Sequence, residues 1–271
     1  MEQLEGLLHS CSSIPLGHAT ISPKSGRQRK SPSYYTLHVT LPTSSPSLSL
    51  QETTLLFLWH SSGIKNNYFI LLFIHSLQIG IPLRPEKDHL LQVKAFSLYK
   101  KKYLEEHKGD SVRPARLVLI GSCRNEGDRK IIEQIKSCAQ ELGVTAQMDL
   151  IINAPYEKLC EFLSKAKVGL HSMWNEHFGI GIVELMASGV VTIAHNSGGP
   201  KEDIVVEYEG QKTGYLASTP EEYADKIYHV LENFESEEHD KMRVAARKSV
   251  HKFSDEEFEK KFLVEIGKIL Q

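Results

Sequence analysis

Short apolar runs alternate with amphipathic helical stripes from residue 85 onward, and this alternation is what most constrains the fold. Each run is brief, continuous and rich in branched aliphatic residues, as expected of a strand buried on both faces of a parallel sheet. The runs are 116–121, 148–153, 167–171 and 190–194. Strand–helix alternation of this kind predicts an α/β fold with a doubly wound, Rossmann-like parallel sheet.

The helices between these runs carry recognisable start signals and apolar faces. Thr219, Pro220 and Glu222 combine an N-cap, a proline at the first helical position and a capping-box glutamate. The segment 128–142 repeats apolar residues at three- and four-residue spacing. Two further starts are predicted at Pro155 and at the capping box Ser254–Glu257, and the last helix carries Phe258, Phe262 and Ile266 on one stripe.

Charge and cysteine usage exclude several classes of function. The 32 basic and 34 acidic side chains nearly balance, so no electrostatic footprint for nucleic acid is present. The four cysteines are scattered, without the spacing of a zinc site or a disulfide framework. The acidic start of the chain does not match a cleaved signal peptide.

Composition changes near residue 84, which divides the chain into two predicted domains. Residues 10–50 are rich in Ser, Pro and Thr and are expected to be poorly ordered. The apolar clump 68–81 is shorter than the roughly 20 residues that span a membrane. It is expected to form a buried strand or helix, or else a membrane-dipping segment. We therefore predict an atypical, largely disordered or partly hydrophobic leader over 1–83 and an α/β domain over 84–271.

Two glutamates in W-N-E-H-F-G-I-G-I-V-E (174–184) raise the question of what they hold. In one helix, Glu176 and Glu184 would lie roughly 12 Å apart along the axis, too far to act together on one atom. They could grip the two ends of an extended ligand, with Gly179 and Gly181 allowing close backbone approach. Alternatively, the glycines serve helix–sheet packing and the glutamates face water.

Two other segments are candidates because parallel sheets bind ligands beyond the carboxyl ends of their strands. In H-N-S-G-G-P-K-E-D (195–203), the amides of Ser197, Gly198 and Gly199 could hold a phosphate, or the segment could be only a turn. In R-P-E-K-D-H (84–89), Arg84 and Lys87 could pair with a diphosphate, or could be surface charges. No Walker A sequence, nucleophile elbow or complete dinucleotide fingerprint occurs.

Jointly, these three segments resemble a known family. The pattern H-S-M-W-N-E-H-F-G-I-G-I-V-E-L-M-A-S-G followed by H-N-S-G-G-P resembles the E-x7-E signature of retaining glycosyltransferases with two Rossmann-like domains, the GT-B architecture. With R-P-E-K-D-H, it looks like the asparagine-linked glycosylation protein 11 family. These are α-1,2-mannosyltransferases that use GDP-mannose and a dolichol-linked oligosaccharide, at the cytosolic face of the endoplasmic reticulum membrane. The resemblance covers about residues 84–271.

The resemblance implies a role for each candidate residue. Glu176 would contact the mannosyl group, as a donor-sugar ligand and electrostatic stabiliser, and Glu184 would hold the guanosine ribose. Lys87 and Arg84 would neutralise the leaving diphosphate. The backbone of Phe178, Gly179 and Ile180, with Gly198 and Gly199, would face the sugar and phosphates. No cofactor and no metal ion are expected, and other mannosyltransferases of the endoplasmic reticulum are expected partners.

The sequence also departs from this family in its first third. The family has an N-terminal membrane anchor and an acceptor-binding domain, and residues 1–83 show no such domain. Pro82 lies where a strand should lead into R-P-E-K. We therefore expect a donor-binding C-terminal half that binds GDP-mannose weakly and transfers little mannose. The alternatives are a non-catalytic Rossmann-like module that binds a partner, and a retaining glycosyltransferase with another nucleotide-sugar donor.

Overall fold

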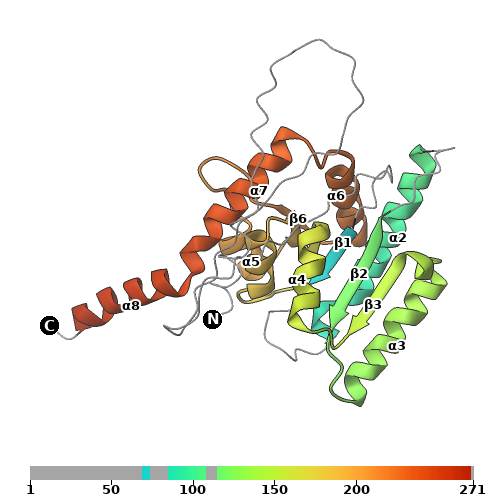
Figure 1. The fold of residues 1–271 in the computed structure, drawn as a ribbon, viewed down its shortest axis with the longest axis horizontal. Coiled ribbons are helices and arrows are strands. Elements are labelled where there is room, and N and C mark those ends of the chain that lie inside the picture. Colours follow the sequence, from blue (N-terminus) through green and yellow to red (C-terminus); the bar gives the residue numbers. More distant parts are fainter. Residues whose placement is uncertain (1–68, 74–84, 108–114, 270–271) are drawn as a thin grey trace, which may run out of the picture. The chain divides into compact units, whose positions relative to one another are not determined.

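A parallel β-sheet organises the part of the chain that the computed structural model describes, residues 69–73, 85–107 and 115–269 (Figure 1). Its strand order is β3-β2-β1-β4-β5-β6, and all neighbouring strands run parallel. The strands are β1 (Phe69–Phe73), β2 (Arg116–Gly121), β3 (Met148–Ile152), β4 (Ala166–His171), β5 (Val191–His195) and β6 (Tyr215–Ala217). The predicted doubly wound α/β fold is confirmed.

The order of the strands reverses between β1 and β4. From β1 the chain builds outward through β2 to β3, and from β4 it builds the other way through β5 to β6. Ile70 of β1 pairs with Leu117 of β2 on one side and with Val168 of β4 on the other. In sheets of this type, ligands bind outside the carboxyl ends of the two strands at such a switch point. The segments that follow β1 and β4 are therefore the first place to look for a site.

Helices cover both faces of the sheet, as the burial of β2 shows. Leu117 and Leu119 belong to one apolar cluster, while Val118 and Ile120 belong to another, because successive side chains of a strand point to opposite faces. The first cluster includes α2 (His89–Glu106), α3 (Glu126–Glu141) and α6 (Pro220–Glu232). The second includes α4 (Tyr156–Lys165) and α5 (Ile180–Ala187), which Figure 1 draws in front of the sheet.

A glycine in β4 allows α5 to pack closely on the sheet. A Cβ atom at Gly169 would lie 2.6 Å from Cδ2 of Leu185, so a larger residue would force the Leu185 side chain out of its present position. Leu185 is fully buried, which at roughly 25 cal/mol per Å² stabilises this contact by about 2 kcal/mol. The helix that follows Glu176 is thus fixed against the strand that precedes it.

The predicted helix starts are largely confirmed. Thr219 and Glu222 form the capping box of α6, and Pro220 is its first residue. The proline predicted to begin α4 is instead its N-cap, with Tyr156 as the first helical residue. The remaining elements are η1 (Pro85–Lys87), η2 (Thr145–Gln147), η3 (Pro200–Ile204), α7 (Glu237–Ser249), η4 (Val250–Phe253) and α8 (Asp255–Ile269). Among the described residues, no helix combines the length and apolar content that crossing a membrane requires.

Three details differ from the sequence prediction. The buried stripe of α3 runs through Ile132 and Ala139 rather than through Leu142, which already follows the helix as its C-cap. β6 was not predicted, because it has only three residues. β1 lies inside the apolar clump 68–81, whose strand alternative holds for 69–73, and the sheet therefore includes residues upstream of 84.

Candidate functional site

Lys87 and Glu176 meet at the switch point of the sheet. Lys87 ends η1, in the segment that follows β1, and Glu176 lies in the loop between β4 and α5. The Lys87 ammonium nitrogen is 2.8 Å from Oε2 of Glu176, and the two side chains are 7% and 12% exposed. Because a buried charge is costly unless it is paired, Lys87 stabilises the ionised form of Glu176.

Two side chains from the end of β4 complete the surroundings of this pair. Nε2 of His171 is 3.6 Å from the same carboxylate oxygen, and Lys87 Nζ donates to Sδ of Met173 at 3.0 Å. The His171 ring and the Lys87 ammonium together lower the pKa of Glu176, against the opposing effect of burial. Burial lowers the pKa of His171, so its ring is neutral at physiological pH. The site thus holds one ammonium and one carboxylate beside a neutral imidazole.

The loop after β5 is fastened to the loop that carries Glu176. The Gly199 amide donates to the Glu176 carbonyl at 2.8 Å, and the Asn175 amide donates to Ser197 Oγ at 2.8 Å. A side chain at Gly198, where φ is 56°, would collide with the Glu176 carbonyl oxygen. The glycine pair therefore permits two backbones to approach closely. Two of the three amides suggested for phosphate are already used within the protein, because Ser197 donates to the His195 carbonyl and Gly199 to the Glu176 carbonyl.

The start of α5 supplies unpaired backbone donors beside Glu176. Gly179 is the N-cap, with φ of 99°, and its carbonyl accepts from the Ile182 amide at 2.9 Å, so the first-turn amides without a partner in the helix are those of Ile180 and Gly181. Such amides favour a negatively charged ligand, as the Lys87 ammonium does. Phe178 is 40% exposed and packs edge-on against Phe253 at 5.1 Å between ring centres. An anion at the start of α5 would therefore lie near both the Lys87 ammonium and the partial positive charge of the helix amides.

One end of the sheet brings together four predicted site residues, Lys87, Glu176, Gly198 and Gly199. Arg84 lies outside the described residues. Glu184 lies inside α5 and is 2% exposed. Neither glutamate faces water, so that part of the alternative is wrong, but the ligand each would hold stays a prediction.

Sequence reasoning missed the contacts of Ser172 and Met173 with the segment after β1. The signal available was the end of the strand 167–171, since residues beyond a carboxyl end lie at the ligand edge. Nothing in the sequence alone predicted that their partners would be Lys87 and its neighbours.

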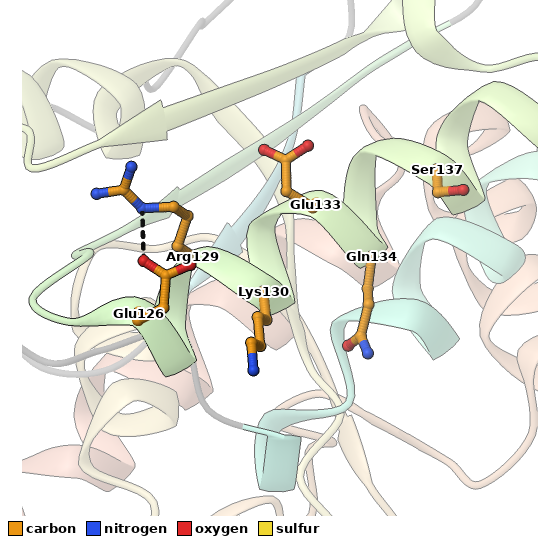
Figure 2. Close-up of a pocket in the computed structure, with 6 residues that line it drawn as sticks. All are labelled: Glu126, Arg129, Lys130, Glu133, Gln134 and Ser137. Carbon is orange, nitrogen blue, oxygen red and sulfur yellow. Dashed lines mark ion pairs between the residues drawn. The ribbon is translucent and has the colours of Figure 1, made fainter.

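A hollow lies on the exposed face of α3 and is separate from this site. Figure 2 shows that one helix supplies all the side chains drawn there, with an ion pair of 3.4 Å between Arg129 and Glu126. Its lining residues are Glu126, Arg129, Lys130, Glu133, Gln134 and Ser137. None of the predicted site residues lines it.

In the part of the chain that is described, no three His, Cys, Asp or Glu side chains gather as metal ligands would.

Comparison with known sequences gives one family and several relatives. The profile of the family described as "Glycosyl transferases group 1" matches residues 60–249. The chain is 49% identical over 187 residues to a mouse (Mus musculus) protein named GDP-Man:Man(3)GlcNAc(2)-PP-Dol alpha-1,2-mannosyltransferase. It is 47% identical over 188 residues to the human protein of the same name. Each alignment covers 69% of this chain and 37% of the relative, so the chain matches little more than a third of their length.

Solved structures support the fold. A glycosyltransferase from Rickettsia africae ESF-5 aligns with a TM-score of 0.60 at 21% identity, over 76% of this chain and 48% of that one. The C-terminal domain of a glycosyl transferase group 1 family protein from Francisella tularensis aligns with a TM-score of 0.53 at 21% identity. There the alignment covers 68% of this chain and 84% of that domain. The described residues therefore share the fold of such a C-terminal domain.

Proposed function

The chain belongs to the glycosyl transferases group 1 family, and from that premise we propose that it binds GDP-mannose as a sugar donor. The reaction it would serve is α-1,2-mannosyl transfer to a dolichol-linked oligosaccharide, the reaction in the printed name of its mouse and human relatives. Because the chain matches 37% of their length, the proposal for this chain concerns the donor-binding part of that reaction.

The observation that carries the proposal is the buried pair of Lys87 and Glu176 at the switch point. A diphosphate carries negative charge next to a sugar rich in hydroxyl groups. An ammonium and first-turn helix amides suit the diphosphate, while a carboxylate suits sugar hydroxyls as a hydrogen-bond acceptor. The site offers the ammonium and the carboxylate within one hydrogen-bond length of each other.

In the proposed reaction, the bond between C1 of mannose and the β-phosphate oxygen breaks, and the acceptor hydroxyl oxygen forms the new bond to C1. GDP leaves, and the acceptor proton moves to its departing phosphate oxygen. Lys87 would stabilise the charge that develops on that oxygen. Glu176 would hold the sugar and stabilise the positive charge at C1, without a covalent intermediate on the protein. We propose that these side chains and amides bind the diphosphate without a metal ion.

Glu184 and Arg84 have secondary roles in the proposal. A buried carboxylate on α5 is suited to accept hydrogen bonds from the ribose hydroxyls once the ligand reaches it. Arg84 stands three residues before Lys87 and would add a second cation for the diphosphate. We further propose that the protein acts at the cytosolic face of the endoplasmic reticulum membrane, beside other mannosyltransferases.

Calorimetry with GDP, UDP and ADP tests the donor. The proposal expects GDP to bind at least tenfold more tightly than UDP or ADP. Equal affinity for all three would reject a guanosine donor, and tighter UDP or ADP binding would favour a different glycosyltransferase.

A transfer assay in a full-length relative tests the two charged residues. The changes equivalent to Lys87→Ala and Glu176→Ala should each lower kcat/KM by on the order of a hundredfold. The control is Lys102→Ala, because Lys102 forms an ion pair of the same 2.8 Å length on the exposed surface. Activity that survives both changes would remove these residues from the mechanism.

A further inference from the structure

A chain of buried polar side chains lies directly behind the Lys87–Glu176 pair. Its members are Ser172, which follows β4, and Gln92 and His89, which belong to α2. They are only 2%, 1% and 3% exposed. Buried polar side chains are costly unless their hydrogen bonds are made, so their partners show what the chain holds together.

These three side chains form a series in which each donates a hydrogen bond to the next, from His89 through Gln92 to Ser172. The Ser172 hydroxyl donates to the carbonyls of Lys87 at 2.6 Å and Asp88 at 3.1 Å. The Gln92 amide nitrogen donates to the Ser172 hydroxyl oxygen, which leaves the Gln92 amide oxygen free to accept. Nδ1 of His89 lies 3.0 Å from that oxygen. Since an amide oxygen only accepts, Nδ1 of His89 carries the proton and donates it.

The charge state of His89 agrees with this arrangement. Burial lowers the pKa of His89 to about 4, with a further lowering by Lys87 and His171 that Gln92 and Asp88 oppose. The ring is therefore neutral at physiological pH and holds a single tautomer. Because the carbonyls of Lys87 and Asp88 can only accept, Ser172, Gln92 and His89 each donate toward them.

These bonds fasten the turn that carries Lys87 to the residue four positions before Glu176. The side chains of Lys87 and Glu176 come from segments 89 positions apart and meet only if that turn and the end of β4 keep one relative position. Tyr223 of α6 also holds this strand end, since its hydroxyl donates to the His171 carbonyl at 2.8 Å. The strand end is thus fixed, and Ser172 transmits its position to the turn.

We propose that Ser172 and Gln92 are positioning residues that hold the Lys87 ammonium against Glu176 and so preset the anion-binding corner of the site. They touch neither Lys87 Nζ nor the Glu176 carboxylate, and act only through the backbone of the turn. The consequence for a GDP-type ligand rests on the proposed function. The effect on Lys87 itself does not.

The first test measures the position of Lys87 without any ligand. Lys87 is 6% exposed and paired, so its amine should react slowly with a reductive-methylation reagent in the 271-residue protein. In Ser172→Ala, we expect Lys87 to be methylated about fivefold faster, as loss of one hydrogen bond would allow. Mass spectrometry of the peptide that contains Lys87 gives the rate.

Ser249→Ala is the matched control. Ser249 is also 2% exposed, and its hydroxyl donates to a backbone carbonyl at 2.8 Å, but it lies on α7 and does not contact the site. This change removes the same kind of buried hydrogen bond and should leave the Lys87 rate unchanged. Gln92→Met, which keeps most of the side-chain volume, should act in the same direction as Ser172→Ala and serves if the serine variant does not fold. Equal Lys87 rates in the wild type and in the folded Ser172 or Gln92 variant would overturn the proposal.

The second test measures whether the position of the Lys87 ammonium against Glu176 affects the binding of GDP. With GDP as the probe in calorimetry, Ser172→Ala should bind about fivefold more weakly than the wild type, and Ser249→Ala should bind equally well. Unchanged GDP affinity in a variant that exposes Lys87 would refute the link to the ligand. If the wild type itself binds no GDP, the proposed function fails, whereas the methylation rates still decide the role of Ser172.

Discussion

At the scale of single residues, the environment of Glu176 makes a direct prediction for stability. Lys87→Ala leaves a carboxylate that is 12% exposed without its ammonium, and breaking a buried pair in this way destabilises by about 3 kcal/mol. Lys102→Ala breaks an ion pair of the same length whose side chains are 39% and 66% exposed, and should cost below about 1 kcal/mol. Urea unfolding of the two variants measures the difference. Equal losses would mean that the Lys87 pair is no better shielded from water than a surface pair.

The neutral His89 ring predicts a stability change in mildly acid solution. Its pKa in the folded state is about 4, below the ordinary value of 6.5, so the unfolded chain takes up the proton first as the pH falls. The free energy of unfolding is unaffected by His89 above pH 6.5 and declines between pH 6.5 and 4. A shift of this size corresponds to about 3 kcal/mol for a buried group.

The variant His89→Asn isolates that effect, because it removes the titrating group. Its unfolding free energy should depend less on pH between 6.5 and 4 than that of the wild type, whatever its stability at neutral pH. His171 and His195 also have lowered pKa values and will leave some slope in both proteins. Identical slopes would show that His89 takes up its proton equally easily in the folded and unfolded states.

Residue identity at the site was predictable, but contact between residues was not. Lys87 and Glu176 are each suggested by a local pattern, a cation before a helix and a carboxylate after a strand. Their meeting depends on β1 and β4 being neighbours in the sheet, and no local signal records that pairing. The same holds for Ser172 and Gln92, which lie 80 positions apart and bond only through the fold.

At the scale of elements, the loop after β5 owes its shape to glycine. Gly198→Ala would both strain a left-handed backbone and bring Cβ against the Glu176 carbonyl, which cannot rotate away. Gly210 has a similar φ of 73°, but a Cβ there would meet nothing within 4 Å. We expect Gly210→Ala to cost about 1 kcal/mol and Gly198→Ala about 3 kcal/mol or more, by chemical unfolding. A similar cost at both positions would mean that strain alone, and not the approach of the two loops, requires glycine.

Helix α8 presents an apolar stripe that no described residue buries. Phe258 and Phe262 are 63% and 51% exposed and stack on each other at 5.8 Å between ring centres. Because exposed aromatic surface favours association, we expect the 271-residue chain to self-associate at high concentration. The double change Phe258→Glu and Phe262→Glu should shift sedimentation toward the monomer, while Leu104→Glu on α2, 51% exposed, should not. A monomeric wild type at high concentration would contradict this.

The elements show where periodicity stops being informative. The four predicted strands and the starts of α4, α6 and α8 were placed within one or two positions, because their signals are local. Helix α7 was not predicted, although Ser236 caps it. β1 was ambiguous, since an apolar run does not distinguish a buried strand from a helix. β6 is too short to show alternation, and it is held by its pairing with β5 rather than by its own sequence.

At the scale of the whole molecule, the strand order explains why three distant segments form one site. The turn after β1, the loop after β4 and the loop after β5 end at the same edge because the strands are parallel and β1, β4 and β5 are neighbours. Any ligand held there would contact residues spread over more than a hundred positions. The family resemblance was specific because these three segments occurred together.

This arrangement predicts that donor binding and sugar transfer separate in the 271-residue chain. The described residues proposed to bind GDP lie in one α/β unit, whereas its mouse and human relatives are matched over only 37% of their length. We therefore expect the purified chain to bind GDP in calorimetry and to transfer little mannose from GDP-mannose to a dolichol-linked oligosaccharide. A full-length relative assayed in parallel controls for the quality of the acceptor. Transfer by the 271-residue chain at a rate near that of the full-length relative would show that this unit alone suffices for the reaction. Absence of GDP binding, with the chain folded, would instead contradict the donor site itself.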